Sequence, residues 1–229
     1  MSKTVSPSIL FIVILAISCD QSPKPPATTP TTPATSTAQT RPPSTKKTIL
    51  FFGNSLTAGY GVNPAEAFPA LIGKKIDSLH LSYQVVNAGL SGETSAGGKS
   101  RISWVLQQPV SIFVLELGGN DGLRGIPLTG TTANLQAIID SVKTHYPDAK
   151  IVLAGMQIPP NMGIDYSTAF RNIFPKLATA NHAALIPFLL QNVGGIPQLN
   201  QADGIHPTAT GHKIVAQNVW QVLGPLLKN

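Results

Sequence analysis

Residues 49–61, ILFFGNSLTAGYG, constrain the fold of this chain more than any other segment. The segment opens with an apolar run, residues 49–52, that is too short for a helix and consists of β-forming types, which indicates a buried strand of a parallel sheet. The strand ends at Gly53, and Ser55 stands directly before a helix-forming run. Because open α/β sheets bind ligands at the carboxyl ends of their strands, Ser55 is either a reactive residue or a simple helix N-cap.

Apolar strands and amphipathic helical patterns alternate along the rest of the chain. Five such βα units predict a parallel sheet with helices on both faces, an α/β fold of three layers. The expected strands are residues 49–52, 83–87, 110–117, 151–154 and 184–188, and the expected helices are residues 65–79, 95–107, 131–146, 166–181 and 208–226. Each strand ends in a loop rich in Gly, Asn or Pro, where a site on such a fold is expected.

Charge and cysteine content exclude several classes of function. The chain has 229 residues and a formal net charge of +6, but residues 1–47 alone hold five Lys and Arg against one Asp. The remaining domain is nearly neutral and has no basic stripe, which argues against a nucleic-acid partner. A lone cysteine, Cys19, excludes an internal disulfide and a thiolate metal cluster. No His, Asp or Glu cluster has the spacing of metal ligands, so we expect neither a metal nor a cofactor.

The first 47 residues differ in composition from the domain that follows. Residues 1–18 contain an apolar run about half as long as a membrane span, which is typical of a signal peptide. The run ends in Ala-Ile-Ser before Cys19 and resembles a bacterial lipobox, which predicts cleavage before Cys19 and a lipid on its thiol; the alternative is a plain signal peptide with an incidental cysteine. Residues 19–47, rich in Pro and Thr, predict a disordered tether, and residues 48–229 the folded domain.

Three later loops carry candidate functional residues. After the second strand, Gly89 lets a backbone N–H approach a ligand, although a glycine there is also typical of a simple turn. After the third strand, the Asn120 amide either donates into the site or caps the next turn. The last loop holds Asp203 and His206, and this spacing either orients an imidazole or marks a helix cap beside a surface histidine.

Together these residues supply the parts of a serine hydrolase site. A serine hydroxyl is a weak nucleophile at neutral pH, so Ser55 needs His206 as its general base and Asp203 to orient the imidazole. The backbone N–H groups of Ser55 and Gly89 and the Asn120 amide would form an oxyanion hole. We therefore predict acyl transfer through a covalent Ser55 intermediate.

On these residues the chain resembles the SGNH (GDSL-type) hydrolase superfamily. The four letters of its name match Ser55, Gly89, Asn120 and His206, and the match covers residues 48–227. The blocks GNSLTAGYG, NAGLSGETSAGG and LELGGNDGLRGIP are most similar to the bacterial arylesterase, thioesterase I and lysophospholipase group. The resemblance implies a flavodoxin-like α/β/α sandwich with a five-stranded parallel sheet, and hydrolysis of carboxylic esters or thioesters.

One position departs from the resemblance. Asn54 stands where the usual GDSL block has Asp, and since that Asp is not one of the three catalytic residues, we expect activity to survive. A G-x-S-x-G elbow is missing because Thr57 occupies its second glycine position, which disfavours an α/β-hydrolase. The remaining histidines are expected to be exposed or on helix surfaces rather than catalytic; they are His80, His145, His182 and His212.

These observations predict an exported bacterial esterase of the cell envelope, anchored by lipid on Cys19 at the outer membrane or periplasmic side. Its substrate would be a small acyl or aryl ester or a lysophospholipid. The apolar loop at residues 156–163 either lines an acyl pocket or only packs beneath other loops. Two alternatives are a carbohydrate O-deacetylase of the same superfamily and a surface binding lipoprotein without activity.

Overall fold

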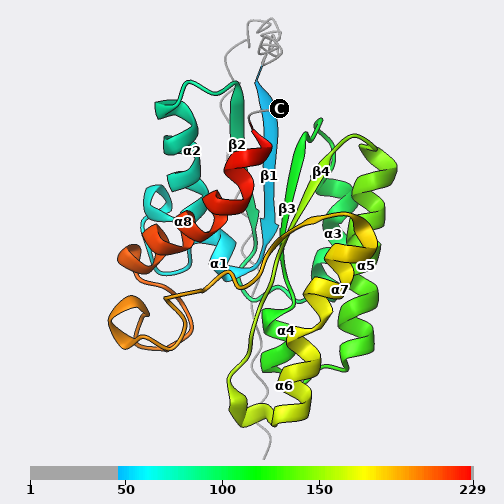
Figure 1. Cartoon of the computed structure of the whole chain (residues 1–229), viewed down its shortest axis with the longest axis vertical. Helices are drawn as coiled ribbons and strands as arrows, with labels where there is room; N and C mark the ends of the chain where they lie inside the picture. The colour runs from blue at the N-terminus through cyan, green and yellow to red at the C-terminus, as the bar shows by residue number, and fades with distance from the viewer. Residues whose placement is uncertain (1–45, 228–229) are drawn as a thin grey trace, which may run out of the picture. The chain divides into compact units, whose positions relative to one another are not determined.

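The computed structural model describes residues 46–227, so the predicted signal peptide, most of the tether and Cys19 lie outside the described residues. The described chain forms a parallel sheet in the order β2-β1-β3-β4-β5 (Figure 1). Because β1 lies between β2 and β3, the chain reverses its direction across the sheet beside β1, which is where ligands bind in such folds. The strands are β1 Lys47–Gly53, β2 Tyr83–Gly89, β3 Ile112–Glu116, β4 Lys150–Ala154 and β5 Ala184–Ile186.

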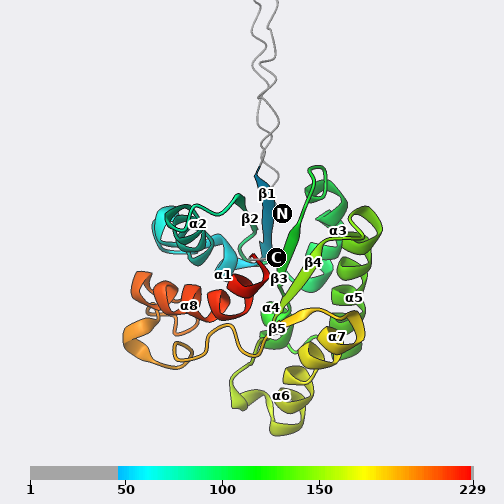
Figure 2. The same ribbon diagram turned by 45° about the horizontal axis from the view of Figure 1, so that its top comes forward.

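Helices cover both faces of this sheet, which confirms the predicted three-layer α/β/α class. Figures 1 and 2 show α2 and α8 on one face and α3, α5 and α7 on the other. The long helices are α2 Phe68–Ser78, α3 Ser95–Val105, α5 Leu128–His145, α6 Ile164–Arg171, α7 Ile173–Asn181 and α8 Ala209–Leu226. Within residues 46–227, no helix is both long and apolar enough to cross a bilayer.

Several helix boundaries differ from the predicted ones. The expected helix at residues 166–181 is two helices that meet at Asn172, because Pro175 lacks an N–H and its ring opposes the carbonyl four residues earlier. The helix expected from residue 65 begins at Phe68, after a short 3₁₀ turn, Pro64–Glu66. Two short helices at the strand ends were not expected from periodicity, since four or five residues carry too little of it; they are α1 Ser55–Ala58 and α4 Gly119–Leu123.

The central strand β1 is buried on both faces of the sheet. Phe51 packs edge-on against Phe68 of α2, with ring centroids 5.6 Å apart. Phe52, which points to the other face, lies 5.6 Å from the ring of Phe113 on β3. Alternation along a strand sends neighbouring residues to opposite faces, so both layers of helices pack on this strand. The carboxyl end of β1 is thereby fixed within the core.

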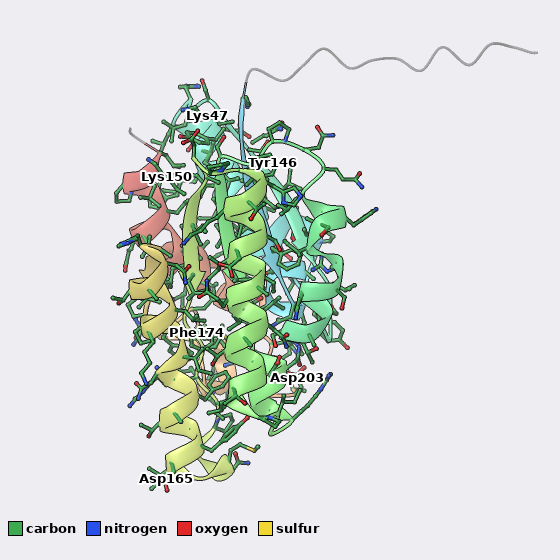
Figure 3. All side chains as sticks on the ribbon, turned by 90° about the vertical axis from the view of Figure 1, so that its right-hand side faces the viewer. Lys47, Tyr146, Lys150, Asp165, Phe174 and Asp203 are labelled. Atoms are coloured by element: carbon green, nitrogen blue, oxygen red, sulfur yellow. The ribbon has the colours of Figure 1, made fainter. Side chains whose placement is uncertain are left out.

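The predicted site lies at the carboxyl edge of the sheet. Figure 3 shows Lys47, which begins β1, near one end of the domain, together with Lys150, which begins β4. Asp203 lies toward the opposite end, where the parallel strands finish. The strand direction therefore brings the loops after β1, β2 and β3 and the loop before α8 to one edge.

His212, on α8, is buried, so the prediction that it is an exposed or surface histidine is wrong. Its Nδ1 accepts a hydrogen bond from the Phe68 N–H at 3.3 Å, and its ring stacks on the Phe68 ring. The missed feature is the contact between α8 and α2, which sequence periodicity does not specify. Burial lowers the pKa of His212 to about 4, so the ring is neutral at physiological pH.

The burial of His212 predicts a pH-dependent stability. Between the ordinary histidine pKa and about 4, the unfolded chain binds a proton that the folded chain rejects, so the free energy of unfolding decreases as pH falls. We expect His212→Asn, whose side-chain oxygen can accept the Phe68 N–H, to remove this component. The stability of the wild type relative to the variant should decline by about 1–3 kcal/mol from pH 7 to pH 4. Urea unfolding across this range measures it, and parallel pH curves would contradict it.

Candidate active site

The reactive serine candidate, Ser55, is the first residue of α1 and follows the turn at the end of β1. The helix is capped by the residue before it, because the Asn54 Oδ1 accepts a hydrogen bond from the Leu56 N–H at 2.9 Å. The alternative in which Ser55 itself caps the helix is therefore wrong. The Ser55 hydroxyl remains available for another partner. The Ser55 backbone N–H is one of the N–H groups at the helix N-terminus that have no acceptor within the helix.

Ser55, His206 and Asp203 form a continuous hydrogen-bonded chain. The Ser55 Oγ lies 2.9 Å from His206 Nε2, and His206 Nδ1 lies 2.7 Å from Asp203 Oδ2. The other oxygen of Asp203 accepts the N–H groups of Ile205 and His206, each at 3.0 Å. The hydrogen bond with His206 lowers the pKa of Asp203 to about 2. An ionised Asp203 favours the tautomer with a proton on Nδ1, so Nε2 can accept the Ser55 proton.

The loop that carries His206 is fastened to the loop after α1. The Gln201 Nε2 donates to the carbonyl oxygens of Tyr60 at 2.7 Å and Pro207 at 3.0 Å. The ring of Tyr60 covers the imidazole of His206, with centroids 4.7 Å apart. These contacts join segments about 140 residues apart and hold the imidazole over the serine.

Asn120 lies beside Ser55 in the same cavity and belongs to the short helix α4. Its Nδ2 donates one hydrogen to the carbonyl oxygen of Glu93 at 2.9 Å, which leaves its second N–H for another acceptor. The next residue, Asp121, is buried and accepts from the Ser95 N–H at 2.8 Å and from the Ser95 hydroxyl. Asp121 thus fixes α4 against α3, and Asn120 with it.

The N–H of Gly89, predicted to be an oxyanion donor, has a hydrogen-bond acceptor within the chain. Its N–H donates to Asn87 Oδ1 at 2.9 Å, so this group is already used within its own strand end. A Cβ at Gly89 would lie 2.2 Å from the backbone nitrogen of Ala58, so the glycine allows α1 to pack on β2. Both observations argue against the predicted role of Gly89 as an oxyanion donor. In the sequence, a glycine after a strand is equally typical of a ligand contact and of close packing between elements.

Gly92, three residues later, lies beside Asn120. Arg124 donates to its carbonyl oxygen at 3.2 Å, and the following residue, Glu93, accepts from Asn120. Gly92 has a φ of +80°, a conformation that favours glycine. Among the residues that the structure describes, no acceptor pairs with its N–H. Gly89 and Gly92 lie in the same sequence block, and the residue pattern alone does not tell which of them has a free N–H.

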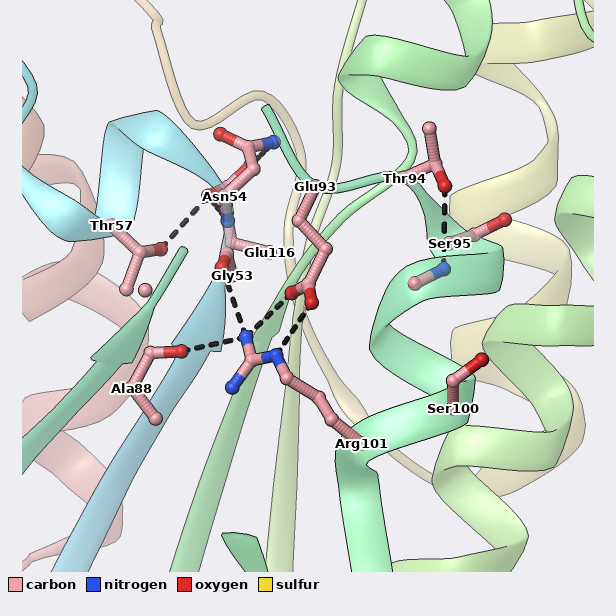
Figure 4. A network of polar contacts seen from close by, with 12 residues as sticks. Gly53, Asn54, Thr57, Ala88, Glu93, Thr94, Ser95, Ser100, Arg101 and Glu116 are labelled. Atoms are coloured by element: carbon pink, nitrogen blue, oxygen red, sulfur yellow. Dashed lines mark hydrogen bonds and ion pairs between the residues drawn. The ribbon is translucent and has the colours of Figure 1, made fainter. Parts of the chain in front are cut away.

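An ion pair between the partly buried Arg101 and the buried Glu93 joins α3 to the ends of β1 and β2 and to the loop after β2. Figure 4 shows Arg101 of α3 reaching Glu93, with its Nε 2.5 Å from Glu93 Oε1. Its Nη2 also donates to the carbonyl of Ala88 at 2.8 Å and lies 3.5 Å from the carbonyl of Gly53. The guanidinium stacks over the ring of Phe52 at 4.1 Å. Because the backbone carbonyl of Glu93 also accepts a hydrogen bond from Asn120, this ion pair helps to hold Asn120, a predicted oxyanion donor.

A second buried carboxyl group, that of Glu116, lies under the serine turn. It receives hydrogen bonds from Asn54 and from the Thr57 hydroxyl, part of the network in Figure 4. Burial raises the pKa of Glu116 to about 7, and the hydrogen bonds from Thr57 and Asn54 oppose this shift. Sequence reasoning missed this residue, although a charged residue within the apolar run IFVLEL was a signal for it.

A largely apolar cavity of about 360 Å³ opens next to Ser55 and His206. The loop after β4 contributes Met156, Ile158 and Pro159 to its wall, so this loop lines the cavity rather than only packing beneath others. Other apolar residues in the wall are Leu56, Leu123, Phe188, Leu190 and Ile205. The volume suits one small ligand with an apolar part. Across residues 46–227, no group of three or more His, Cys, Asp or Glu side chains could hold a metal ion.

Comparisons with known proteins agree with this geometry. The sequence model of the GDSL-like lipase/acylhydrolase family matches residues 51–214. The esterase TesA of Pseudomonas aeruginosa is 39% identical over 182 residues, which cover 79% of this chain and 90% of that protein. Thioesterase 1/protease 1/lysophospholipase L1 of Escherichia coli K12 is 39% identical over 80% of this chain and 86% of its own length. A crystal structure of TesA matches 79% of this chain and all of that chain with a TM-score of 0.75.

The ion pair between Arg101 and Glu93 predicts a large effect of removing one partner. Arg101→Met leaves a buried carboxylate without a counter-charge and the Ala88 carbonyl without its donor. We expect the free energy of unfolding to fall by about 3–5 kcal/mol, because the buried Glu93 carboxylate would be left without its partner. Denaturant titration measures this loss.

The exposed pair between Lys46 and Asp77, at 3.1 Å, provides the control. Asp77→Asn should change the free energy of unfolding by less than about 1 kcal/mol, because water screens exposed charges. If Arg101→Met and Asp77→Asn have equal effects, the ion pair at the site does not hold its loops together.

Proposed function

We propose that this chain, an ester hydrolase that belongs to the GDSL-like lipase/acylhydrolase family, uses Ser55 as its nucleophile. His206 removes the hydroxyl proton as general base, and Asp203 holds the imidazole in the required tautomer. The observation that carries this proposal is the unbroken contact from Ser55 Oγ through His206 to Asp203, at 2.9 Å and 2.7 Å.

The reaction has two steps in this proposal. The Ser55 oxygen attacks the ester carbonyl carbon, and His206 gives the accepted proton to the departing alcohol, which leaves an acyl-Ser intermediate. Water then attacks the acyl carbon with His206 again as the base, and the carboxylic acid is released. Both steps pass through a tetrahedral carbon with negative charge on its oxygen.

We assign that oxyanion to three donors. Two of them are the Ser55 N–H and the second N–H of the Asn120 amide, since both residues line the cavity and Asn120 uses one N–H for the Glu93 carbonyl. Gly92 replaces Gly89 as the third donor, because Gly92 lies beside Asn120 and its N–H is unpaired among the described residues. Donors held rigid before reaction stabilise the charge without reorganising, which is the largest single contribution in many such sites.

The apolar cavity supports an acyl or aryl ester, or a lysophospholipid, as the substrate class. Most of its wall is apolar, with Met156, Ile158 and Leu190 among its residues, so most of a bound group would contact apolar side chains. This favours an acyl or aryl group over the acetylated carbohydrate of the alternative proposal. Methionine is unbranched and adapts to different shapes, which suits several acyl lengths.

The N-terminal residues support export and attachment to a bacterial membrane. Cys19, which follows the apolar run and precedes a Pro- and Thr-rich segment, would carry the lipid. The lipid would hold the enzyme at the cell envelope, near membrane lipids. A single acyl chain binds membranes only weakly, so stable attachment needs the several chains of a lipoprotein anchor.

Hydrolysis of p-nitrophenyl esters from acetyl to palmitoyl tests the reaction and the substrate class together. The wild type should turn over esters with longer acyl chains better than the acetyl ester. Ser55→Ala should lower kcat by at least about 10³-fold. Asn120→Ala, which removes one oxyanion donor, should lower kcat by about 10²–10³-fold with a small change in KM.

Two results would contradict this assignment. An active Ser55→Ala variant would exclude the proposed nucleophile. Strong turnover of the acetyl ester alone, with release of acetate from acetylated glycans, would favour the carbohydrate O-deacetylase. A folded Ser55→Ala protein, checked by circular dichroism, is the control for lost structure.

The anchor is tested separately in cells of a Gram-negative host. Wild type should incorporate an alkyne-labelled fatty acid and sediment with membranes. Cys19→Ser should incorporate none and appear in the soluble fraction, because it lacks the thiol that accepts the lipid. Absence of label from the wild type would favour the plain signal peptide.

A further inference from the structure

We propose that Glu116 is a positioning residue for ester hydrolysis, and that its buried carboxylate holds the serine turn in place through Asn54 and Thr57. This inference rests on the proposed role of Ser55 as the nucleophile. Glu116 ends β3 and is 1% exposed, so it cannot touch a substrate from the cavity. Its function must therefore be exerted through the residues that it binds.

Three donors from the serine turn converge on this carboxylate. The Asn54 Nδ2 donates to Oε1 at 2.7 Å, and the Asn54 N–H donates to Oε2 at 3.1 Å. The Thr57 hydroxyl also donates to Oε2, at 2.8 Å. Asn54 precedes Ser55 and Thr57 follows it in the sequence. The carboxylate of Glu116 is therefore hydrogen-bonded to the turn on both sides of the proposed nucleophile. At a pH above its raised pKa of about 7, Glu116 is ionised, and hydrogen bonds to an ionised acceptor are stronger than those to a neutral one.

The Asn54 side chain has one orientation that satisfies its surroundings. Its Oδ1 accepts the Leu56 N–H at 2.9 Å and lies 3.3 Å from Ser55 Oγ, while its Nδ2 faces Glu116. A flipped amide would set its NH₂ group against the Leu56 N–H and its oxygen against the carboxylate. Asn54 therefore couples the helix N-terminus on one side to Glu116 on the other.

An asparagine at position 54 suits the neighbouring carboxylate of Glu116 because an amide can donate a hydrogen bond to it. An aspartate at position 54, which the usual GDSL block has, would place two carboxyl groups across a 2.7 Å contact, where they could remain only by sharing a proton. The amide of Asn54 supplies a hydrogen instead, so Glu116 can accept all three donors as a carboxylate. The pairing of Asn54 with Glu116 is thus a property of this chain's own residues.

The position of this turn controls the reaction geometry. The Ser55 Oγ must stay 2.9 Å from His206 Nε2 for proton transfer, and displacement of a reacting group by about 1 Å can cost on the order of 10²-fold in rate. The cavity that holds the acyl group is built largely from other loops. Loss of the Glu116 contacts should therefore lower kcat while leaving KM nearly unchanged.

An exchange of the amide and the carboxylate tests the pairing. In Glu116→Gln, the new amide oxygen can accept from the Asn54 N–H and Thr57, but its NH₂ group then faces the NH₂ group of Asn54. We expect kcat to fall by at least about tenfold, with KM within about threefold of wild type. In the double variant Asn54→Asp/Glu116→Gln, the amide donates to the new aspartate, and every hydrogen bond of the turn is restored. Its kcat should return to within about threefold of wild type.

The single variant Asn54→Asp completes a double-mutant cycle between residues 54 and 116. The proposal requires this substitution to lower kcat in the wild-type background, where it opposes two carboxyl groups, and to raise kcat in the Glu116→Gln background. If Asn54→Asp fails to raise kcat there, Glu116 does not act through Asn54, and the inference is overturned. Ser55→Ala in the same assay separates this failure from failure of the proposed function, because an active Ser55→Ala would overturn the nucleophile itself.

A milder pair of variants covers the case in which Glu116→Gln does not fold. Thr57→Val removes a single hydrogen bond to Glu116 Oε2, and Thr57→Ser retains the hydroxyl. We expect Thr57→Val to lower kcat several-fold with little change in KM, and Thr57→Ser to recover most of this loss. Equal kcat values for Thr57→Val and wild type would contradict the role of the carboxylate on this side of the turn.

Discussion

The hydrogen bonds that Glu116 accepts are the interactions on which the edge of the sheet that carries the site depends. The backbone leaves β1 at Gly53 in so narrow a space that an added Cβ would lie 2.6 Å from Glu116 Oε2. The turn fits there because Gly53 has no side chain and because Asn54 and Thr57 satisfy the buried oxygens. A buried carboxylate without such donors would be costly, so the polar turn and the charged strand end stabilise each other.

Two buried carboxyl groups stabilise different parts of the site. Glu116 holds the turn that carries Ser55, the proposed nucleophile, whereas Glu93 and Arg101 hold the loop that contacts Asn120. Arg101 also reaches the carbonyl oxygens at the ends of β1 and β2, so the two supports meet at Gly53. Rigid support of this kind is what an oxyanion hole requires, because donors that are already oriented need not reorganise during reaction.

Residue patterns predicted the sheet, the two helical layers and the identities of Ser55, Asn120, Asp203 and His206. The structure brings all four together at one edge, which follows from parallel strands. The surroundings of Gly89 and His212 depend on neighbouring elements that local patterns do not show. Gly89 contacts the backbone of α1, and His212, predicted to lie at the surface, is buried against Phe68 of α2. Local sequence does not specify which surfaces meet.

Local residue patterns specified the order of strands and helices and the chemical groups that reach the carboxyl edge, because periodicity and loop composition are local properties. Packing in three dimensions established which glycine N–H has no acceptor among the described residues and which carboxyl group lies beneath the serine turn. It also decided that Asn54, rather than Ser55, caps α1. These choices depend on distances of a few ångströms between segments such as Asn54 and Glu116, which are 62 residues apart in the chain. Packing sets such distances, and packing is a property of the whole fold.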